Sequence, residues 1–220
     1  MAVKVKICGV RTPAVIEVAA EAGADYVGLV IFPQSPRHVE IEEARVLAAI
    51  AKGKLGTVAV LVDPDDALID EVVERVRPDL LQLHGAETPE RVAAIKARAG
   101  LPVMKAIAIA EAADVANASI YAGSADYLLF DAKAPASATL LGGNGVAFDW
   151  HALKNAKAPF ALSGGLTPDT VGEAIMLTGA ALVDVSSGVE REPGEKDVTL
   201  VRRFIQAAKS AAPQARAKAS

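Results

Sequence analysis

The sequence of 220 residues has few of the side chains that form cross-links or bind metals. It contains one cysteine, Cys8, and three histidines, His38, His84 and His151. A single thiol excludes an intramolecular disulfide and is typical of a reducing compartment. The histidines have no metal-ligand spacing among themselves or with Cys8, so we expect no metal site.

Long apolar runs and aromatic residues are scarce as well. No run approaches the roughly 20 apolar residues that span a bilayer, and the opening residues lack the apolar segment of a secretory signal. Hydrophobic residues make up 52% of the chain but aromatic ones only 4%, a balance typical of parallel strands covered by helices. These features predict a soluble, cytoplasmic protein with no membrane partner.

Clustered positive charge and nucleotide-binding motifs are absent too. The formal net charge is −4 and the isoelectric point is about 5.5, with Lys and Arg scattered along the chain. This pattern argues against a nucleic-acid partner. No GxGxxG follows the first strand and there is no P-loop, so we expect no nucleotide cofactor. The partner that remains is a small molecule, bound by a monomer or a homodimer.

What the sequence does contain is a regular alternation of short β-like runs and longer helical patterns. The predicted strands are 3–8, 26–31, 57–62, 80–84, 103–109, 126–131, 160–164 and 182–187. The predicted helices include 14–23, 40–51, 65–77, 88–99, 169–178 and 198–211. Thr-Pro pairs at 12–13, 88–89 and 167–168 favour helix starts, and Gly23 and Gly100 favour helix ends.

Eight such units without a linker predict an α/β fold, a single (β/α)8 TIM barrel with a parallel eight-stranded core, over residues 1–210. The alternative is an open doubly wound sheet, which uses the same alternation but usually fewer strands. The tail 211–220, rich in alanine and polar residues, is expected to be disordered.

Chemically capable residues follow the predicted strands, where a barrel forms its active site. Cys8 ends the first strand, and alternation places it above Lys6, facing the barrel mouth. The same register brings Lys6 close to Asp184 on the last strand, which gives a buried ammonium a partner. A lone cysteine is often an inert core residue, but beside a cation it is a plausible base.

Asp131 and His84 end two further strands, and Arg37 follows a rigid Ser-Pro turn at the rim. Asp131 either caps a loop or, partly withdrawn from water opposite the first strand, acts as an acid. An acid and a base across a cavity are the minimum apparatus for an isomerisation. Arg37 is either an ordinary surface residue or a group that holds a carboxylate through two hydrogen bonds.

Glycine turns end the seventh and eighth strands, where barrel enzymes commonly bind phosphate through backbone N–H groups. They predict a phosphorylated substrate. The residues concerned are Gly164 and Gly165 in the first turn, and Ser187 and Gly188 in the second. The loop 140–150, with Gly143 and Gly145, is either a flexible connection or a loop that contacts phosphate or closes as a lid.

Taken together, the motifs resemble those of the phosphoribosylanthranilate isomerase family of tryptophan biosynthesis. The resemblance covers almost the whole chain in the family's order. The matching stretches are KICG (6–9), GADYVGLVIFPQSPR (23–37), LQLHG (81–85), LLFDA (128–132), GGNGVAFDW (142–150), SGGLTPDTV (163–171) and VDVSSGVEREPGEKD (183–197).

This resemblance implies an Amadori rearrangement without a cofactor, which converts N-(5′-phosphoribosyl)anthranilate to 1-(o-carboxyphenylamino)-1-deoxyribulose 5-phosphate. It implies that Asp131 is the general acid that opens the furanose ring and that Cys8 is the general base that removes the C2′ proton. Arg37 is then expected to hold the anthranilate carboxylate and the glycine turns the phosphate. His84 and Asp184 are expected to position the substrate.

The chain departs from the family pattern at Asn144, where threonine is more usual, and at Ser163, where alanine is more usual. Both changes are small, and they bear on phosphate contacts rather than on the reaction. One alternative is the related family of histidine-pathway aldose isomerases. That family has aspartate at the position of Cys8, so the cysteine argues against it. A catalytically silent barrel that binds a sugar phosphate is the other alternative, and we expect it to lack Cys8 or Asp131.

Overall fold

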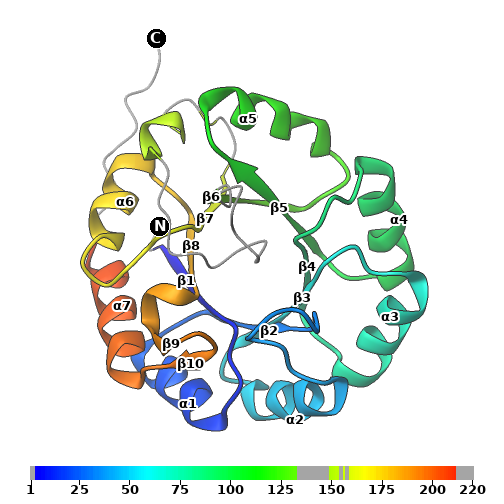
Figure 1. The fold of residues 1–220 in the computed structure, drawn as a ribbon, viewed down its shortest axis with the longest axis horizontal. Coiled ribbons are helices and arrows are strands. Elements are labelled where there is room, and N and C mark those ends of the chain that lie inside the picture. The colour runs from blue at the N-terminus through cyan, green and yellow to red at the C-terminus, as the bar shows by residue number, and fades with distance from the viewer. Residues whose placement is uncertain (1–2, 133–148, 154–155, 157–158, 212–220) are drawn as a thin grey trace.

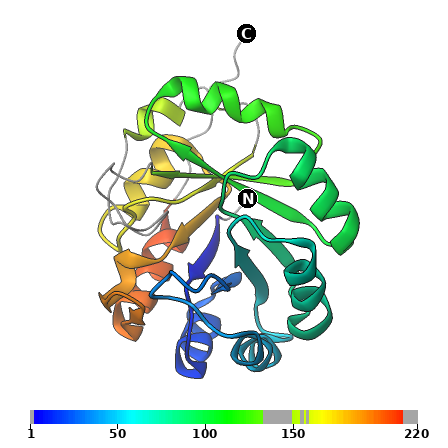
Figure 2. The same ribbon diagram turned by 45° about the vertical axis from the view of Figure 1, so that its right-hand side comes forward.

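The computed structural model describes residues 3–132, 149–153, 156 and 159–211, and these form a closed barrel. Eight parallel strands follow one another in chain order, and the last pairs with the first (Figures 1 and 2). They are β1 (Lys4–Cys8), β2 (Tyr26–Val30), β3 (Gly56–Leu61), β4 (Leu80–Leu83), β5 (Val103–Ile109), β6 (Tyr127–Ala132), β7 (Ala161–Leu162) and β8 (Leu182–Val185). The predicted (β/α)8 barrel is confirmed.

The helices form an outer ring around the strands (Figure 1). They are α1 (Pro13–Ala22), α2 (Ile41–Ala51), α3 (Asp66–Glu71), α4 (Pro89–Ala99), α5 (Ala112–Asn117), α6 (Val171–Thr178) and α7 (Val198–Ser210). Shorter elements are the π-helical η1 (Val72–Val76), the 3-10 helices η2 (Ala118–Tyr121), η3 (Trp150–Leu153) and η4 (Ser187–Val189), and a hairpin of β9 (Glu190–Glu192) and β10 (Glu195–Lys196). The sequence pattern did not predict α5, the 3-10 helices or the hairpin.

Helix ends follow the predicted signals unevenly. Gly23 and Gly100 end α1 and α4 in the left-handed conformation, as predicted. Thr88 accepts a backbone N–H bond in the first turn of α4, as a capping hydroxyl does. The start predicted at Thr167 is wrong, because the N-cap of α6 is Thr170.

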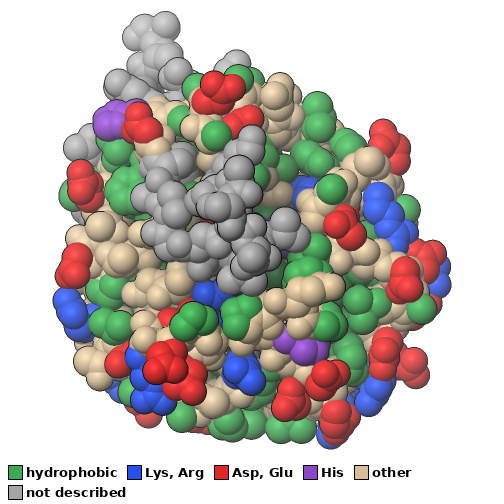
Figure 3. Space-filling view, in the orientation of Figure 1, with side chains coloured by type: hydrophobic (Ala, Val, Ile, Leu, Met, Phe, Trp, Pro, Cys, Tyr) green, Lys and Arg blue, Asp and Glu red, His purple; other side chains and the backbone are tan. Residues whose placement is uncertain are grey.

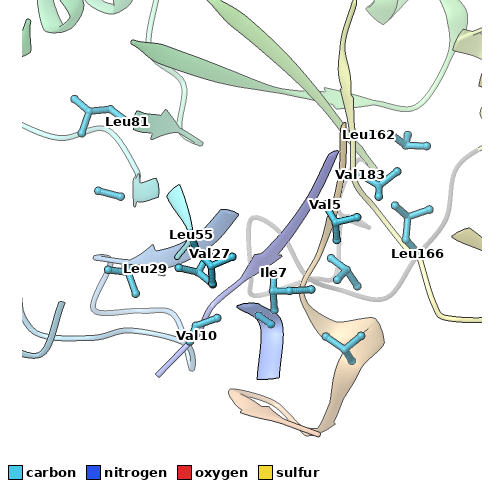
Figure 4. Packing of buried hydrophobic residues seen from close by; sticks show 14 of the residues in the cluster. Val5, Ile7, Val10, Val27, Leu29, Leu55, Leu81, Leu162, Leu166 and Val183 are labelled. Carbon is cyan, nitrogen blue, oxygen red and sulfur yellow. The ribbon is translucent and has the colours of Figure 1, made fainter. Parts of the chain in front are cut away.

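Apolar side chains on the outer face of the barrel form the main core, between strands and helices. Val5 and Ile7 of β1 lie on this face with Val183 of β8 and Leu162 of β7, and all four are fully or almost fully buried (Figure 4). Alternation along each strand sends the intervening residues into the barrel. The outward-facing side chains of the strands therefore pack against the helices, and the inward-facing side chains line the interior of the barrel.

The interior has a second, smaller apolar cluster. It is formed by Cys8, Val30, Val58, Val60, Leu80, Met104, Ala106, Leu129, Ala161 and Leu182. The ladder of β1 and β8 pairs Lys6 with Asp184, so two charged side chains enter this interior side by side. The register inferred from the sequence is confirmed.

Charged side chains on the viewed face are distributed over the periphery. Outside the grey atoms of Figure 3, both acidic and basic groups are scattered around the edge of this face. None of the helices in the described residues combines the length and apolar character of a membrane span. Helix α7 ends at Ser210, and residues 212–220 of the predicted tail lie outside the described residues, so the disorder of the tail stays a prediction.

Candidate active site

An ion pair lies inside the barrel directly below Cys8. Nζ of Lys6 donates to both carboxylate oxygens of Asp184, each at 3.0 Å, and neither side chain is more than 4% exposed. Burial alone would lower the pKa of Lys6, but Asp184 and Cys8 outweigh it and raise that pKa. Lys6 is therefore a fixed positive charge beneath the thiol.

A glycine on the neighbouring strand makes room for this arrangement. Gly28 pairs with Cys8 in the ladder between β1 and β2. A Cβ at Gly28 would lie 2.9 Å from Sγ of Cys8 and 3.0 Å from Nζ of Lys6. The absent side chain is thus a condition for both groups to share the interior.

Burial decides the protonation of Cys8. It raises the pKa of the thiol, while the charge of Lys6, and less strongly that of Lys196, lowers it. Asp184 adds to the rise, so the net shift is upward. The charge of Lys6 favours the thiolate, as expected from the sequence, but desolvation of the buried thiol is the larger effect.

Asp131 and His84 lie together at the carboxyl ends of β6 and β4. Nε2 of His84 is 3.3 Å from Oδ2 of Asp131, and the other oxygen of Asp131 accepts the backbone N–H of Ala132 at 2.9 Å. Asp131 is 6% exposed, so it is withdrawn from water but reaches the barrel mouth. The predicted grouping of these two residues on one rim is confirmed.

Gln82 supports His84 from below. Its Nε2 lies 3.1 Å from Nδ1 of His84, and as an N–H group it can only donate. In this contact Nδ1 is the acceptor, and Nε2 is the ring nitrogen that faces Asp131. Oε1 of Gln82 is buried without a hydrogen-bond partner among the described residues.

A second buried ion pair clamps the segment that carries His84. Nζ of Lys105 lies 2.8 Å from Oε2 of Glu87 and donates to the carbonyl oxygens of Leu83 and Gly85, at 3.4 and 2.7 Å. The backbone N–H of Gly85 donates back to Glu87 at 3.1 Å. Both neighbours of His84 in the chain are therefore fixed by one charged pair.

Replacement of Lys105 by methionine is expected to destabilise the fold by about 3–5 kcal/mol, because it leaves the Glu87 carboxylate buried without its cation. Urea unfolding followed by circular dichroism measures the change. The matched control is Lys96→Met, which removes a partly exposed pair with Asp126 and should cost about 1 kcal/mol or less. If Lys105→Met unfolds at the wild-type midpoint, the clamp contributes nothing.

Arg37 lies at the edge of the mouth near β1, and its guanidinium is engaged by the segment after β8. Nε and Nη2 donate to the two carboxylate oxygens of Glu190, both at 2.8 Å. Lys196 contacts the same carboxylate at 2.6 Å. Arg37 is only 6% exposed, so it is not the ordinary surface residue that the sequence left open as an alternative.

The glycine turns after β7 and β8 touch each other. A Cβ at Gly188 would lie 1.9 Å from the carbonyl oxygen of Leu166, so backbone meets backbone there. Gly164 and Gly165 have φ of +87° and +65°, a conformation that glycine adopts without strain. A Cβ at Gly164 would also approach Oδ1 of Asp131 to 3.0 Å. The two turns therefore form one continuous backbone surface next to Asp131.

Not every predicted site residue lies in the described part of the chain. Gly143 and Gly145 lie outside the described residues, so their contact with phosphate stays a prediction. In the described part of the chain, no three His, Cys, Asp or Glu side chains are grouped so that they could hold a metal ion. The sequence pattern missed Glu190 and Lys196, although both stand in the stretch that follows the last strand.

The matches to known proteins agree with this geometry. The sequence model of N-(5′-phosphoribosyl)anthranilate (PRA) isomerase matches residues 5–207. The isomerase of Paramagnetospirillum magneticum is 54% identical over 97% of this chain and 100% of its own length. That of Bradyrhizobium is 53% identical over 96% of this chain and 97% of its own length.

Solved structures give the same assignment. Phosphoribosyl anthranilate isomerase from Thermotoga maritima is 34% identical, with a TM-score of 0.84 over 94% of this chain and 98% of that one. A second isomerase structure, in complex with reduced 1-(o-carboxyphenylamino)-1-deoxyribulose 5-phosphate, has a TM-score of 0.82 at 33% identity over the same shares. This chain therefore belongs to the N-(5′-phosphoribosyl)anthranilate isomerase family.

Proposed function

We propose that the chain converts N-(5′-phosphoribosyl)anthranilate to 1-(o-carboxyphenylamino)-1-deoxyribulose 5-phosphate, with Asp131 as general acid and Cys8 as general base. The observation that carries the proposal is the arrangement of two proton-transfer groups on one mouth, each with its own supporting pair. Cys8 stands above Lys6 and Asp184. Asp131 stands beside His84.

In the first step Asp131 gives its proton to the furanose ring oxygen. The bond between C1′ and that oxygen breaks, and the nitrogen lone pair forms the C=N bond of a protonated Schiff base. The position of Asp131 supports this role, because it is largely withdrawn from bulk water at the mouth of the barrel, where a bound substrate can meet it. His84 keeps the acid oriented through its contact with Oδ2.

In the second step the Cys8 thiolate takes the proton from C2′. The C–H electrons form the C1′–C2′ double bond, and the C=N electrons return to nitrogen to give an enolamine, which tautomerises to the ketone. Lys6 supports the thiolate electrostatically, and a base whose pKa is raised by burial accepts a proton strongly once it is deprotonated. Both steps are proton transfers, so the proposed mechanism uses no cofactor.

Substrate binding is assigned to the groups around these two. Arg37 holds the anthranilate carboxylate, and the backbone surface of Gly164, Gly165, Ser187 and Gly188 holds the phosphate. The mutual contact of the two turns supports the phosphate assignment, because adjoining backbone N–H groups suit an anion.

The direct test follows the loss of anthranilate fluorescence when purified protein is mixed with N-(5′-phosphoribosyl)anthranilate. We expect turnover without added metal or nucleotide. The control is the aminoaldose substrate of the histidine-pathway isomerases, for which little or no turnover is expected. A protein that binds the substrate without consuming it would be the catalytically silent barrel instead.

A further inference from the structure

The β9–β10 hairpin lies near β1 and β8 (Figure 1), and a buried cluster of charges joins it to Arg37. Glu190 begins β9 and accepts both bonds from Arg37 at 2.8 Å. Lys196 ends β10, pairs with Glu190 across the hairpin, and reaches its Oε1 at 2.6 Å. The three side chains are at most 7% exposed. One carboxylate is therefore shared between two buried cations.

The hairpin also holds the backbone and the stem of Arg37. A Cβ at Gly194, in the hairpin turn, would lie 2.4 Å from the carbonyl oxygen of Pro36. A Cβ at Gly9 would lie 2.7 Å from Cδ of Arg37, so the aliphatic stem rests on the chain just after Cys8. Arg37 is fixed at its head by Glu190 and along its stem by Gly9.

The two bonds to Glu190 determine the orientation of the Arg37 guanidinium group. The guanidinium group of arginine is planar, and one of its edges can hold a carboxylate through two parallel hydrogen bonds. Glu190 takes the edge formed by Nε and Nη2. These two bonds fix the plane of the guanidinium group, and a substrate carboxylate must meet it in that plane.

The net charge of the cluster also favours the binding of a substrate carboxylate. Arg37 and Lys196 are positive and Glu190 is negative, so the three groups together carry one positive charge. Without Lys196, Glu190 would cancel the charge that Arg37 offers to an anion. Lys196 also donates to Oγ of Ser186, which donates to the carbonyl oxygen of Cys8. The cluster is thus tied to the backbone that carries the proposed base.

We infer that Glu190 is a positioning residue that orients Arg37 and, together with Lys196, sets the preference of the site for substrates with a carboxylate on the aromatic amine. This inference rests on the proposed contact between Arg37 and the anthranilate carboxylate. The competing explanation is that the Glu190–Lys196 pair only stabilises the hairpin. The two explanations differ in which substrates a variant should affect.

The experiment compares kcat/KM for N-(5′-phosphoribosyl)anthranilate with kcat/KM for N-(5′-phosphoribosyl)aniline, which lacks the carboxylate. We expect Glu190→Gln to lower the ratio of the two values by about 10-fold, mostly through KM of the carboxylated substrate, because a charged contact is sensitive to misplacement. Lys196→Met is expected to lower the same ratio. The control is Glu195→Gln, an exposed pair with Arg191 on the same hairpin, which should leave the ratio unchanged.

The outcomes separate this inference from the proposal beneath it. If Arg37→Lys leaves the ratio unchanged, the carboxylate contact assigned to Arg37 is wrong. If Arg37→Lys lowers the ratio but Glu190→Gln and Lys196→Met lower both kcat/KM values equally, the pair only stabilises the hairpin. Should Glu190→Gln not fold, Lys196→Met alone decides between the two.

Discussion

Asparagine in place of Asp131 is expected to lower kcat by about 10²- to 10⁴-fold, the contribution typical of a general acid. Asparagine has nearly the same shape, and its amide oxygen can still accept the backbone N–H of Ala132. What it lacks is a proton that it can give to the ring oxygen. The loss should therefore appear in catalysis and not in the folded structure.

Single-turnover kinetics measures this loss best, because a slow release of product would hide part of it. Thermal unfolding of the variant should stay close to wild type. The matched control is Asp70→Asn on α3, where an exposed carboxylate pairs with Arg98, and its kcat should not change. Near wild-type turnover by Asp131→Asn would mean that another group opens the ring.

His84 offers a check on the same acid. Glutamine at this position keeps a polar group near Oδ2 of Asp131 but removes the imidazole that Gln82 orients. A positioning role predicts a fall in kcat that is smaller than for Asp131→Asn, with KM and thermal unfolding close to wild type. An unchanged kcat would mean that the contact of His84 does not orient the acid.

The sequence predicted the barrel and much of the site because the period of two along a strand is a local property. Once β1 was recognised, alternation placed Lys6 and Cys8 on the inner face, and the closure of the barrel paired Lys6 with Asp184. These inferences need only the number of residues between side chains and the order of the strands.

What the sequence did not predict depends on contacts between distant segments. Glu190 and Lys196 meet Arg37 only because the chain turns back after β8 into a hairpin. Lys105 is on the outer face of β5, where a helix-facing strand residue is normally apolar, and only its contact with Glu87 explains the charge. No periodic pattern marks either cluster.

The protonation of Cys8 shows the same limit. A cation next to a thiol predicts a low pKa, and Lys6 does act in that direction. Because Gly28 leaves just enough space for Sγ and Nζ, the site is closely packed, and desolvation exceeds the effect of the charge. The balance depends on how deeply the two groups are buried, which the order of residues does not state.

Serine in place of Cys8 is expected to lower kcat by about 10²- to 10⁴-fold, because a hydroxyl group is a far weaker acid than a thiol and yields almost no anion at neutral pH. The side chains are similar in size, so unfolding by urea should change little. Deuterium at C2′ of the substrate identifies the affected step. If Cys8→Ser retains wild-type kcat, Cys8 is the inert core residue that a lone cysteine often is.

The pH dependence of the wild-type enzyme then follows from the upward shift of the Cys8 pKa. A raised pKa means that thiol predominates near neutral pH, so kcat/KM should rise with pH as thiolate forms. Lys6→Met removes the larger opposing charge and raises the Cys8 pKa further, which moves the rising limb to higher pH. Lys6→Met/Asp184→Asn avoids an unpaired buried carboxylate, and its limb should also move upward, because Lys6 affects Cys8 more strongly than Asp184 does. A rising limb at the wild-type pH in both variants would show that Lys6 does not tune the base.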